Sequence, residues 1–426
     1  MKSVVRILML SALSSIFSIS VAGENKNVLS DSVQWPQWRG PNRDGVVGGP
    51  KWPERLEKDS LTRLWRVELG PSYSTPIVIE DRVFTTETKN KESEVVTALD
   101  RKTGKELWRA EWKGAMSVPF FAAANGSWIR STPAYDGECL YVAGICDVLV
   151  CLDGKTGSER WRVDFVKQFS APLPAFGCVC SPLVDGDALY FQAGASVFKL
   201  NKKTGEILWR ALKDEGGMNG SAFSSPILAD LAGQRQLIVQ TRDKLAGIDP
   251  GSGNVLWIQK VPNFRGMNIL TPVVFGDAVF TSSYMNMAWL YKVAKTGDSF
   301  TVTEEWSNTA KGYMCSPVVV DGHAYLHLQS QRFACIELKT GTITWTAGQS
   351  LGKYCSLVAQ GDRILALDQR GRLILFKANP KAYELIDTLE ISDSETWAHL
   401  AVSGDQVFIR ELKALSVYRW NDVKKP

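Results

Sequence analysis

The side chains that could do chemistry are few, because the 426 residues include only three histidines. His323 and His327 lie four residues apart in a strand-like segment, a separation of about 13 Å at the rise of a β-strand. That distance is too long for two ligands of one metal ion. His399 begins another apolar run, where we expect a structural role. The sequence contains no serine nucleophile elbow, phosphate-binding loop or zinc-protease helix.

The eight cysteines leave two alternatives open. Cysteines of an exported chain usually pair, but the connectivity of eight cannot be deduced from sequence. Cys139 and Cys151 lie on adjacent strands of one predicted hairpin, whose turn is near Ile145, so they are the candidate disulfide. Buried free thiols are an equal alternative.

Three further cysteines stand directly before the serine of a repeated motif, at Cys180, Cys315 and Cys355. Cys315 and Cys355 belong to neighbouring units, so a disulfide or a soft-metal site is one interpretation. The equivalent positions of other units hold Ser, Leu or Ala. A packing position for a small side chain is therefore the favoured interpretation.

An internal repeat fixes the elements that must position these side chains. Residues 99–109, 152–162 and 200–210 share a Leu, an Asp or Asn, a Thr-Gly pair and a Trp four residues after the Gly. Weaker copies occupy residues 248–257, 296–306 and 336–345. A second motif alternates with the first, at Thr75-Pro76, Thr132-Pro133, Ser181-Pro182, Ser225-Pro226, Thr271-Pro272 and Ser316-Pro317, with degenerate copies at Ser356-Leu357 and His399-Leu400.

The second motif occurs eight times, at intervals of about 40 to 57 residues, which is the range of propeller repeats. Each unit contains four short strands separated by Gly turns; in the third unit they are residues 181–184, 188–193, 197–200 and 207–212. The sequence therefore predicts an all-β, eight-bladed β-propeller with four-stranded antiparallel blades. Residues 61–69 resemble an isolated fourth strand, and the last unit has only three strands. We expect this N-terminal strand to close the eighth blade.

The repeated Trp is expected to pack from the outermost strand against the neighbouring blade, because every blade has the same need. The Gly of the same turn is expected to supply a positive φ. The repeated Trp residues are Trp65, Trp108, Trp161, Trp209, Trp257, Trp306 and Trp345.

The pattern Leu-Asp-x-x-Thr-Gly-x-x-x-Trp resembles that of the pyrroloquinoline-quinone (PQQ)-type β-propellers, which include quinoprotein dehydrogenases and the outer-membrane assembly lipoprotein BamB. The likeness covers residues 61–420. Residues 35–45 resemble the opening motif of secreted PQQ-like propellers of planctomycetes and related bacteria. The resemblance implies either a binding and assembly scaffold or a PQQ- and Ca²⁺-dependent dehydrogenase of alcohols or sugars.

The dehydrogenase alternative implies a quinone above Ca²⁺ with Glu and Asn ligands, an Asp base and often a disulfide between adjacent cysteines. This chain has no adjacent cysteine pair. Asp147, Asp243 and Asp368 fall in turns between second and third strands, on the face where a base would lie, but no evident Glu and Asn accompany them. Backbone carbonyls can also bind Ca²⁺, so the alternative stays open while a non-catalytic scaffold is favoured. We assign no catalytic, cofactor-binding or metal-binding residue.

Strand alternation sorts the connections onto two faces of the ring. The short Asp-Gly and Thr-Gly turns share one face, and the longer, individual links between units share the other. Variable loops on a rigid scaffold are where binding usually occurs. We therefore predict a binding face made of Phe120, Phe121, Trp128, Arg130, Phe176, Phe264, Tyr313 and Trp397. The equal alternative is that these aromatic side chains plug the mouth of the channel.

Residues 1–22 are expected to be a cleaved signal peptide, with Lys2 and Arg6 before an apolar stretch and small residues up to Ala22. The protein is then periplasmic or secreted, and no other stretch is long enough to span a membrane. Residues 23–60 are expected to form an N-terminal arm that packs on the propeller, and residues 421–426 a tail. The arm contains three Trp residues, at Trp35, Trp38 and Trp52, and a candidate polar staple of Arg39, Asn42, Arg43 and Asp44.

The formal net charge of +4 gives no general attraction to nucleic acid. The expected partner is an envelope protein, a glycan or a small-molecule ligand. We expect the chain to act as a monomer.

Overall fold

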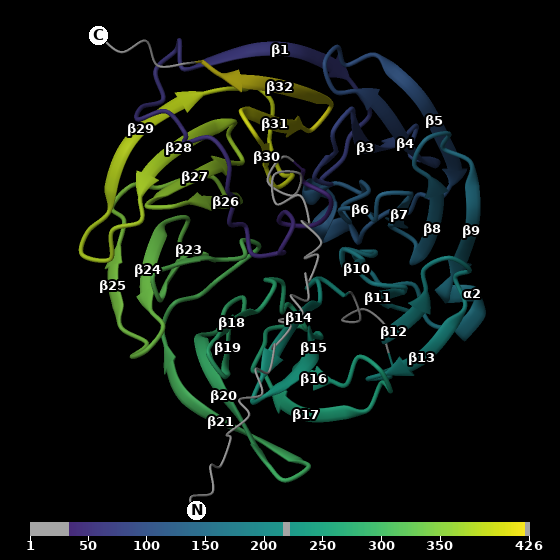
Figure 1. Ribbon diagram of the computed structural model, residues 1–426, viewed down its shortest axis with the longest axis vertical. Coiled ribbons are helices and arrows are strands. Elements are labelled where there is room, and N and C mark those ends of the chain that lie inside the picture. The colour runs from purple at the N-terminus through teal and green to yellow at the C-terminus, as the bar shows by residue number, and fades with distance from the viewer. Residues whose placement is uncertain (1–33, 216–221, 422–426) are drawn as a thin grey trace, which may run out of the picture.

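The computed structural model describes residues 34–215 and 222–421. The predicted signal peptide, the beginning of the predicted arm and residues 422–426 of the predicted tail lie outside the described residues. The described chain forms eight antiparallel sheets of four strands, arranged in a ring about a central channel (Figure 1). The predicted eight-bladed β-propeller is confirmed.

Blades one to four follow one another in the chain, and in each blade the first strand is innermost. Their strands are β2 (Ile77–Val78), β3 (Arg82–Lys89), β4 (Ser93–Asp100) and β5 (Glu106–Lys113); β6 (Ala134–Tyr135), β7 (Cys139–Gly144), β8 (Val148–Asp153) and β9 (Glu159–Asp164); β10 (Leu183–Asp185), β11 (Ala188–Ala193), β12 (Ser196–Asn201) and β13 (Ile207–Ala211); β14 (Ile227–Leu231), β15 (Gln234–Gln240), β16 (Lys244–Ile248) and β17 (Val255–Lys260).

Blades five to eight continue the ring. Their strands are β18 (Val273–Phe275), β19 (Ala278–Ser282), β20 (Ala288–Thr296) and β21 (Ser299–Asn308); β22 (Val318–Val320), β23 (His323–His327), β24 (Phe333–Glu337) and β25 (Ile343–Thr346); β26 (Cys355–Gln360), β27 (Arg363–Asp368), β28 (Arg372–Lys377) and β29 (Glu384–Glu390); β30 (Ala401–Ser403), β31 (Gln406–Glu411), β32 (Ala414–Trp420) and β1 (Leu61–Glu68).

The eighth blade joins the two ends of the described chain. Strand β1 pairs antiparallel with β32, from Leu61 opposite Trp420 to Glu68 opposite Ala414. Leu61 and Trp65 of β1 are buried in one apolar cluster with side chains of β31 and β32. The predicted closure by an N-terminal strand is therefore confirmed, and within the described residues no blade lacks its outer strand.

Two short helices lie in the links between blades: the 3₁₀ helix η1 (Phe120–Asn125) after blade one, and α2 (Phe165–Phe169) after blade two. No helix in residues 34–215 and 222–421 is long and apolar enough to span a membrane.

The repeated Trp connects one blade to the next. The Trp65 Nε1 donates to the Arg101 carbonyl at 2.9 Å, and the indole lies so close to Gly104, where φ is +72°, that a Cβ there would be 2.8 Å from the ring. Five other Trp residues make the same donation to the following blade: Trp108 to Gly154, Trp161 to Lys202, Trp209 to Pro250, Trp306 to Leu338 and Trp345 to Asn379.

Trp257 differs from this pattern, because its Nε1 donates to Gln236 Oε1 of its own blade at 2.7 Å. The next blade has the long β20–β21 hairpin, and Gly297 in its turn has no heavy atom within 4 Å of where a Cβ would be placed. The longer hairpin carries the Gly turn away from the Trp, so the contact between blades is lost there.

The hydroxyl of the Ser/Thr-Pro motif links the inner strands around the channel. The Thr75 N–H donates to Thr132 Oγ1 at 3.2 Å, and the Thr132 N–H donates to Ser181 Oγ at 3.0 Å. The Ser181 N–H continues the series to Ser225 Oγ at 2.9 Å. Since the Pro that follows has no N–H, the motif residue supplies the bond between neighbouring blades.

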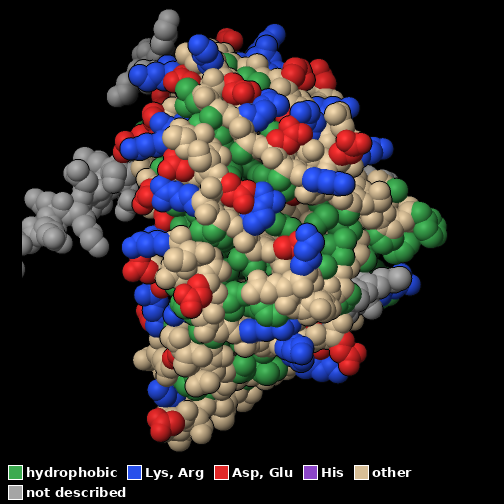
Figure 2. Space-filling view, turned by 90° about the vertical axis from the view of Figure 1, so that its right-hand side faces the viewer, with side chains coloured by type: hydrophobic (Ala, Val, Ile, Leu, Met, Phe, Trp, Pro, Cys, Tyr) green, Lys and Arg blue, Asp and Glu red, His purple; other side chains and the backbone are tan. Residues whose placement is uncertain are grey.

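The two faces of the ring differ in composition. We call the side with the Asp-Gly and Thr-Gly turns the turn face, and the side with the links between blades the loop face. Figure 2 shows Lys, Arg, Asp and Glu side chains along one edge of the disc and a projecting group of hydrophobic side chains at the opposite edge.

The N-terminal arm lies in the central channel and then runs out over the seventh blade to β1 (Figure 1). Trp35 is fully buried and exchanges backbone hydrogen bonds with Val78 at 2.7 and 3.0 Å. Val47 bonds to the carbonyl of Ala359 at the turn-face end of β26. Between these two anchors, residues 36–46 turn inside the channel and reach towards the loop face.

A candidate binding pocket at the mouth of the channel

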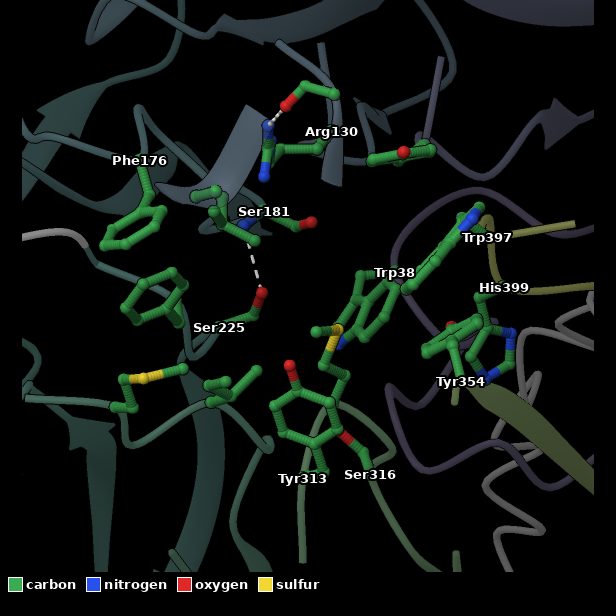
Figure 3. Close-up of a pocket in the computed structure, with 18 of the residues that line it drawn as sticks. Trp38, Arg130, Phe176, Ser181, Ser225, Tyr313, Ser316, Tyr354, Trp397 and His399 are labelled. Carbon is green, nitrogen blue, oxygen red and sulfur yellow. Dashed lines mark hydrogen bonds between the residues drawn. The ribbon is translucent and has the colours of Figure 1, made fainter. Parts of the chain in front are cut away.

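A pocket of about 160 Å³ opens on the loop face above the N-terminal arm (Figure 3). Trp38 of the arm forms its inner end, where the indole Nε1 donates to Thr271 Oγ1 at 2.9 Å. The Trp38 ring also meets the His399 ring edge-on, with centroids 5.2 Å apart. The arm thus fills the channel and leaves the pocket open above it.

One repeat position from every blade contributes to the pocket wall, namely the residue three before the Pro of the Ser/Thr-Pro motif or its equivalent. We call these eight residues the pocket ring: Tyr73, Arg130, Val179, Phe223, Ile269, Met314, Tyr354 and Trp397. Seven of them are uncharged and mostly apolar, and Arg130 is the one charged member.

Four of the eight predicted binding residues line this pocket: Arg130, Phe176, Tyr313 and Trp397. Their rings form two aromatic walls. Trp397 lies between Tyr73 and Tyr354, with centroids 5.5 and 6.1 Å away. Phe176 lies 5.9 Å from Phe223 on the other side.

Three other predicted residues are exposed on the same face. Phe120 and Phe121 of η1 are 91% and 56% exposed, and Phe264 is 40% exposed. The Phe121 ring meets the Phe176 ring edge-on at 6.3 Å, so the exposed pair continues from the pocket wall to the surface. Trp128 is partly buried against Gly126 and does not line the pocket.

Trp38, Tyr73 and Tyr354 line the pocket but do not belong to the predicted binding face. From the sequence, the arm with Trp38 is expected only to pack on the propeller, and the ring position before the Ser/Thr-Pro motif becomes visible in a comparison of the blades. That comparison was available in the sequence, because the spacing from ring residue to Pro is the same in all six complete copies of the motif. The position of the arm inside the channel had no such signal.

Arg130 carries the charge of the pocket. Its Nη2 donates to the Gly126 carbonyl at 2.9 Å and its Nε to the Trp128 carbonyl at 3.2 Å. The guanidinium also lies 5.7 Å from the centre of the Tyr73 ring. Burial lowers the pKa of Arg130 to about 10, which leaves it charged at neutral pH. No carboxylate forms an ion pair with it in residues 34–215 and 222–421.

Two more buried arginines lie below the pocket in the arm. Arg43 donates to the carbonyls of Ser181 and Pro182 at 3.1 and 2.9 Å, and Arg39 donates to the carbonyls of Asp44 and Pro317. Burial lowers the pKa of each to about 10, so both are charged at neutral pH. The channel beneath the pocket is therefore positively charged.

The three aspartates considered for catalysis lie away from the pocket lining. Asp147 is buried, and its carboxylate accepts the Gly194 N–H of the next blade at 2.9 Å; burial raises its pKa to about 6. Asp368 is fully buried and accepts the N–H groups of Gly352, Arg370 and Arg372. Asp243 lies beside Thr241 and Lys244 at the surface. Two of these carboxylates therefore hold backbone in place.

A quinone bound over Ca²⁺ does not fit these residues. Ca²⁺ requires six to eight oxygen ligands, usually including carboxylates. The pocket lining contains no Asp, Glu, Asn or Gln side chain. In the described parts of the chain, no group of three or more His, Cys, Asp and Glu side chains could hold a metal ion.

The cysteines are all free thiols in the structure. Strand register places Cys139 opposite Asp153 and Cys151 opposite Tyr141. The two cysteines lie on the adjacent strands β7 and β8, as the sequence predicted, and are diagonal neighbours rather than a directly opposed pair. Cys180, Cys315 and Cys355 are buried beside the inner strands, and burial raises the pKa of each thiol.

Comparison with known proteins places the fold in a family. The model of a family described as outer membrane protein assembly factor BamB matches residues 55–121 and 91–347. BamB of Yersinia pestis is 21% identical over 264 residues, which cover 58% of this chain and 63% of that protein. The match thus spans less than two thirds of that relative.

Two solved structures are similar to this one. The BamB structure from Moraxella catarrhalis has a TM-score of 0.61 at 12% identity, covering 86% of this chain and 99% of that one. Quinohemoprotein alcohol dehydrogenase from Comamonas testosteroni has a TM-score of 0.65 at 12% identity, covering 93% of this chain and 82% of that one. At this identity the two structures show a shared fold alone.

Proposed function

Because this chain belongs to the BamB family of β-propellers, we propose that it is an exported, non-catalytic scaffold whose loop face binds an envelope protein. The relatives are described as outer membrane protein assembly factors. A fold alone does not assign a function. The proposal therefore rests on the pocket and its surroundings.

The observation that carries the proposal is the aromatic pocket with the exposed Phe120 and Phe121 beside it. Exposed aromatic side chains around a concave apolar site are typical of protein-binding surfaces. A glycan would need many hydrogen-bonding side chains, and half of the pocket ring offers none, namely Val179, Phe223, Ile269 and Met314. An apolar segment of a protein partner matches the lining best.

Site-specific photo-crosslinking tests this proposal. A photoreactive residue at Phe120 is compared with one at Leu107, an apolar side chain of β5 that is 47% exposed and lies away from the pocket lining. Cells that express each variant are irradiated, and adducts are identified by mass spectrometry. We expect an envelope protein to be captured from position 120 and not from position 107. Equal capture from both positions, or none from position 120, contradicts the proposal.

The dehydrogenase alternative is tested in parallel by titration with PQQ and Ca²⁺, followed by an assay of alcohols and aldoses with an artificial electron acceptor. We expect neither tight quinone binding nor turnover. Tight binding with dye reduction that is lost in Asp147→Asn or Asp368→Asn, while both variants stay folded, would overturn the scaffold proposal.

A further inference from the structure

The pocket ring combines an apolar surface with one positive charge. Its uncharged members are two Tyr, one Trp, one Phe and three aliphatic side chains, contributed by seven of the eight blades. Arg130, from the second blade, stands alone among them. A charged side chain is rarely placed in an apolar site unless something pairs with it.

The guanidinium of Arg130 is fixed but not neutralised. Its two hydrogen bonds, to the carbonyls of Gly126 and Trp128, hold one edge of the group against its own loop. Figure 3 shows its terminal nitrogens at the edge of the pocket, one of them bonded to a carbonyl and the other directed into the open space. Nη1 has no acceptor among the described residues. An anionic ligand group could accept from this nitrogen.

Serine hydroxyls add further donors to the lining of the pocket. Ser181 Oγ and Ser225 Oγ accept backbone N–H bonds from the preceding blade at 3.0 and 2.9 Å, and Ser316 Oγ accepts one at 2.9 Å. A hydroxyl that accepts from the backbone keeps its own O–H for donation. All three line the pocket, so its polar groups favour an acceptor ligand.

The charges around the pocket also favour an anionic ligand group. Arg39 and Arg43 lie in the arm below Trp38, bound mainly to backbone carbonyls, with Asp44 as the nearby acidic residue. Above the pocket, the Glu395 carboxylate accepts the Trp397 Nε1 at 2.9 Å and is exposed. Buried charges act through a low dielectric, whereas exposed ones are screened by water. The positive potential therefore prevails inside the pocket.

The size of the pocket limits the ligand to about one ring. Its volume is about 160 Å³, close to the roughly 150 Å³ of a cavity that binds benzene. A chain that leaves the pocket next to Phe176 would pass over Phe121 and Phe120, whose rings form a continuous aromatic surface. The residues that precede a bound terminal residue in the partner would therefore pack on Phe120 and Phe121.

We propose that the pocket binds the C-terminal residue of the partner polypeptide, with a large apolar side chain between the aromatic walls and the α-carboxylate on Arg130. This proposal rests on the proposed function and names the part of the partner that is recognised. An internal Asp or Glu side chain would offer a carboxylate to Arg130 but no large apolar group to the aromatic walls. A C-terminal Phe, Tyr, Trp or Leu places both groups on one residue, as the pocket requires.

Peptide binding tests this proposal with the full-length mature protein. A fluorescein-labelled decapeptide of Ser and Leu ending in Phe is titrated as the free acid and as the C-terminal amide, with fluorescence anisotropy as the readout. We expect the amide to bind at least tenfold more weakly, because it removes the charge that pairs with the guanidinium. Equal affinity of acid and amide would overturn the proposal without the need for any variant.

Variants of Arg130 test whether the α-carboxylate of the peptide binds this side chain. Arg130→Gln is expected to abolish the difference between acid and amide, and Arg130→Lys to retain part of it. Arg162→Gln, in β9 and paired with Glu159, is the matched control and should behave as the wild type. Melting temperatures of all four proteins are compared. An unchanged preference in folded Arg130→Gln would contradict the assignment.

A free aromatic acid could supply the same chemistry as a C-terminal residue. Hydrocinnamate is therefore used as a competitor. We expect displacement only at concentrations at least a hundredfold above those of the peptide, because the acid lacks contacts with Phe120 and Phe121. Binding of hydrocinnamate as tight as that of the peptide would overturn the polypeptide assignment. If crosslinking captures a partner whose binding is unaffected by a C-terminal extension, this inference fails while the proposed function stands.

Discussion

The turn face and the loop face differ in the pKa values of their carboxylates, which are lowered on the first and raised on the second. On the turn face, Asp100 accepts the N–H groups of Lys102 and Thr103 and the Thr103 hydroxyl, which lower its pKa. Asp153 repeats the arrangement, and Arg160 is the main cause of its lowered pKa. At the loop-face ends of the blades, burial raises the pKa of Glu94 to about 8 and that of Asp147 to about 6.

The contrast separates the turns, whose structure follows from the repeat, from the links between blades, whose structure does not. A turn-face carboxylate accepts hydrogen bonds within its own turn, so the Asp-x-x-Thr-Gly pattern can recur in several blades. Loop-face groups find partners in the neighbouring blade, as Asp147 does at Gly194, or keep an unused donor, as Arg130 does. Each link can therefore differ, and a binding site can be built there without disturbing the ring.

Deleting residues 23–69 should have the largest effect, because it removes both the arm that fills the channel and the outer strand of the eighth blade. Both faces depend on a closed ring. We expect no cooperative thermal transition and an aggregated or expanded species in size-exclusion chromatography. A monomer with an unchanged melting temperature would show that the faces do not need closure.

Gly104→Ala should weaken the turn face by about 3 kcal/mol, because it combines a positive φ with a Cβ 2.8 Å from the Trp65 ring. Gly233→Ala is the matched control, with φ at +75° and open space around the new Cβ. Gly233→Ala should lower the free energy of unfolding by about 1 kcal/mol, which is the cost of the positive φ alone. Chemical denaturation measures both. Equal losses would mean that the packing of Trp65 on Gly104 contributes little.

Glu94 should make stability fall as pH rises from about 6.5 to 8.5. Its folded pKa, about 8, lies above its ordinary value of 4.5 because of burial, so the folded state holds a proton that the unfolded state has lost. Stability falls through that window by about 2 kcal/mol and levels off above the folded pKa. Denaturation of Glu94→Gln should lack this slope. A wild-type free energy of unfolding that is flat over the window would contradict the assignment.

The double substitution Phe120→Ala with Phe121→Ala should have the smallest effect on stability, within about 0.5 kcal/mol, since both rings are largely exposed. Phe165→Ala in α2, whose ring is fully buried against Phe198, is the contrast and should cost about 3–5 kcal/mol. Thermal and chemical denaturation report both values. A large loss in the double variant would mean that these rings are part of the core.

The sequence was sufficient for the fold because the Thr-Gly…Trp unit recurs at intervals typical of propeller blades, and because the two ends of the chain together complete one blade. It was also sufficient to assign the loop face as the aromatic one. It could not place Trp38 at the end of the pocket, because residues 34–47 belong to no repeat and their position depends on the width of the channel. Nor could it show that Cys139 and Cys151 are diagonal neighbours, because strand register is set by turn geometry that the spacing alone leaves open.

Amide hydrogen exchange of the complex with the crosslinked partner tests directly whether the partner binds the loop face. We predict slower exchange in residues 114–130, 166–180 and 222–225 of the loop face, and no change in the turns at residues 100–105 and 153–158. Protection of the turn-face turns, with exchange in the loop-face links unaltered, would contradict it.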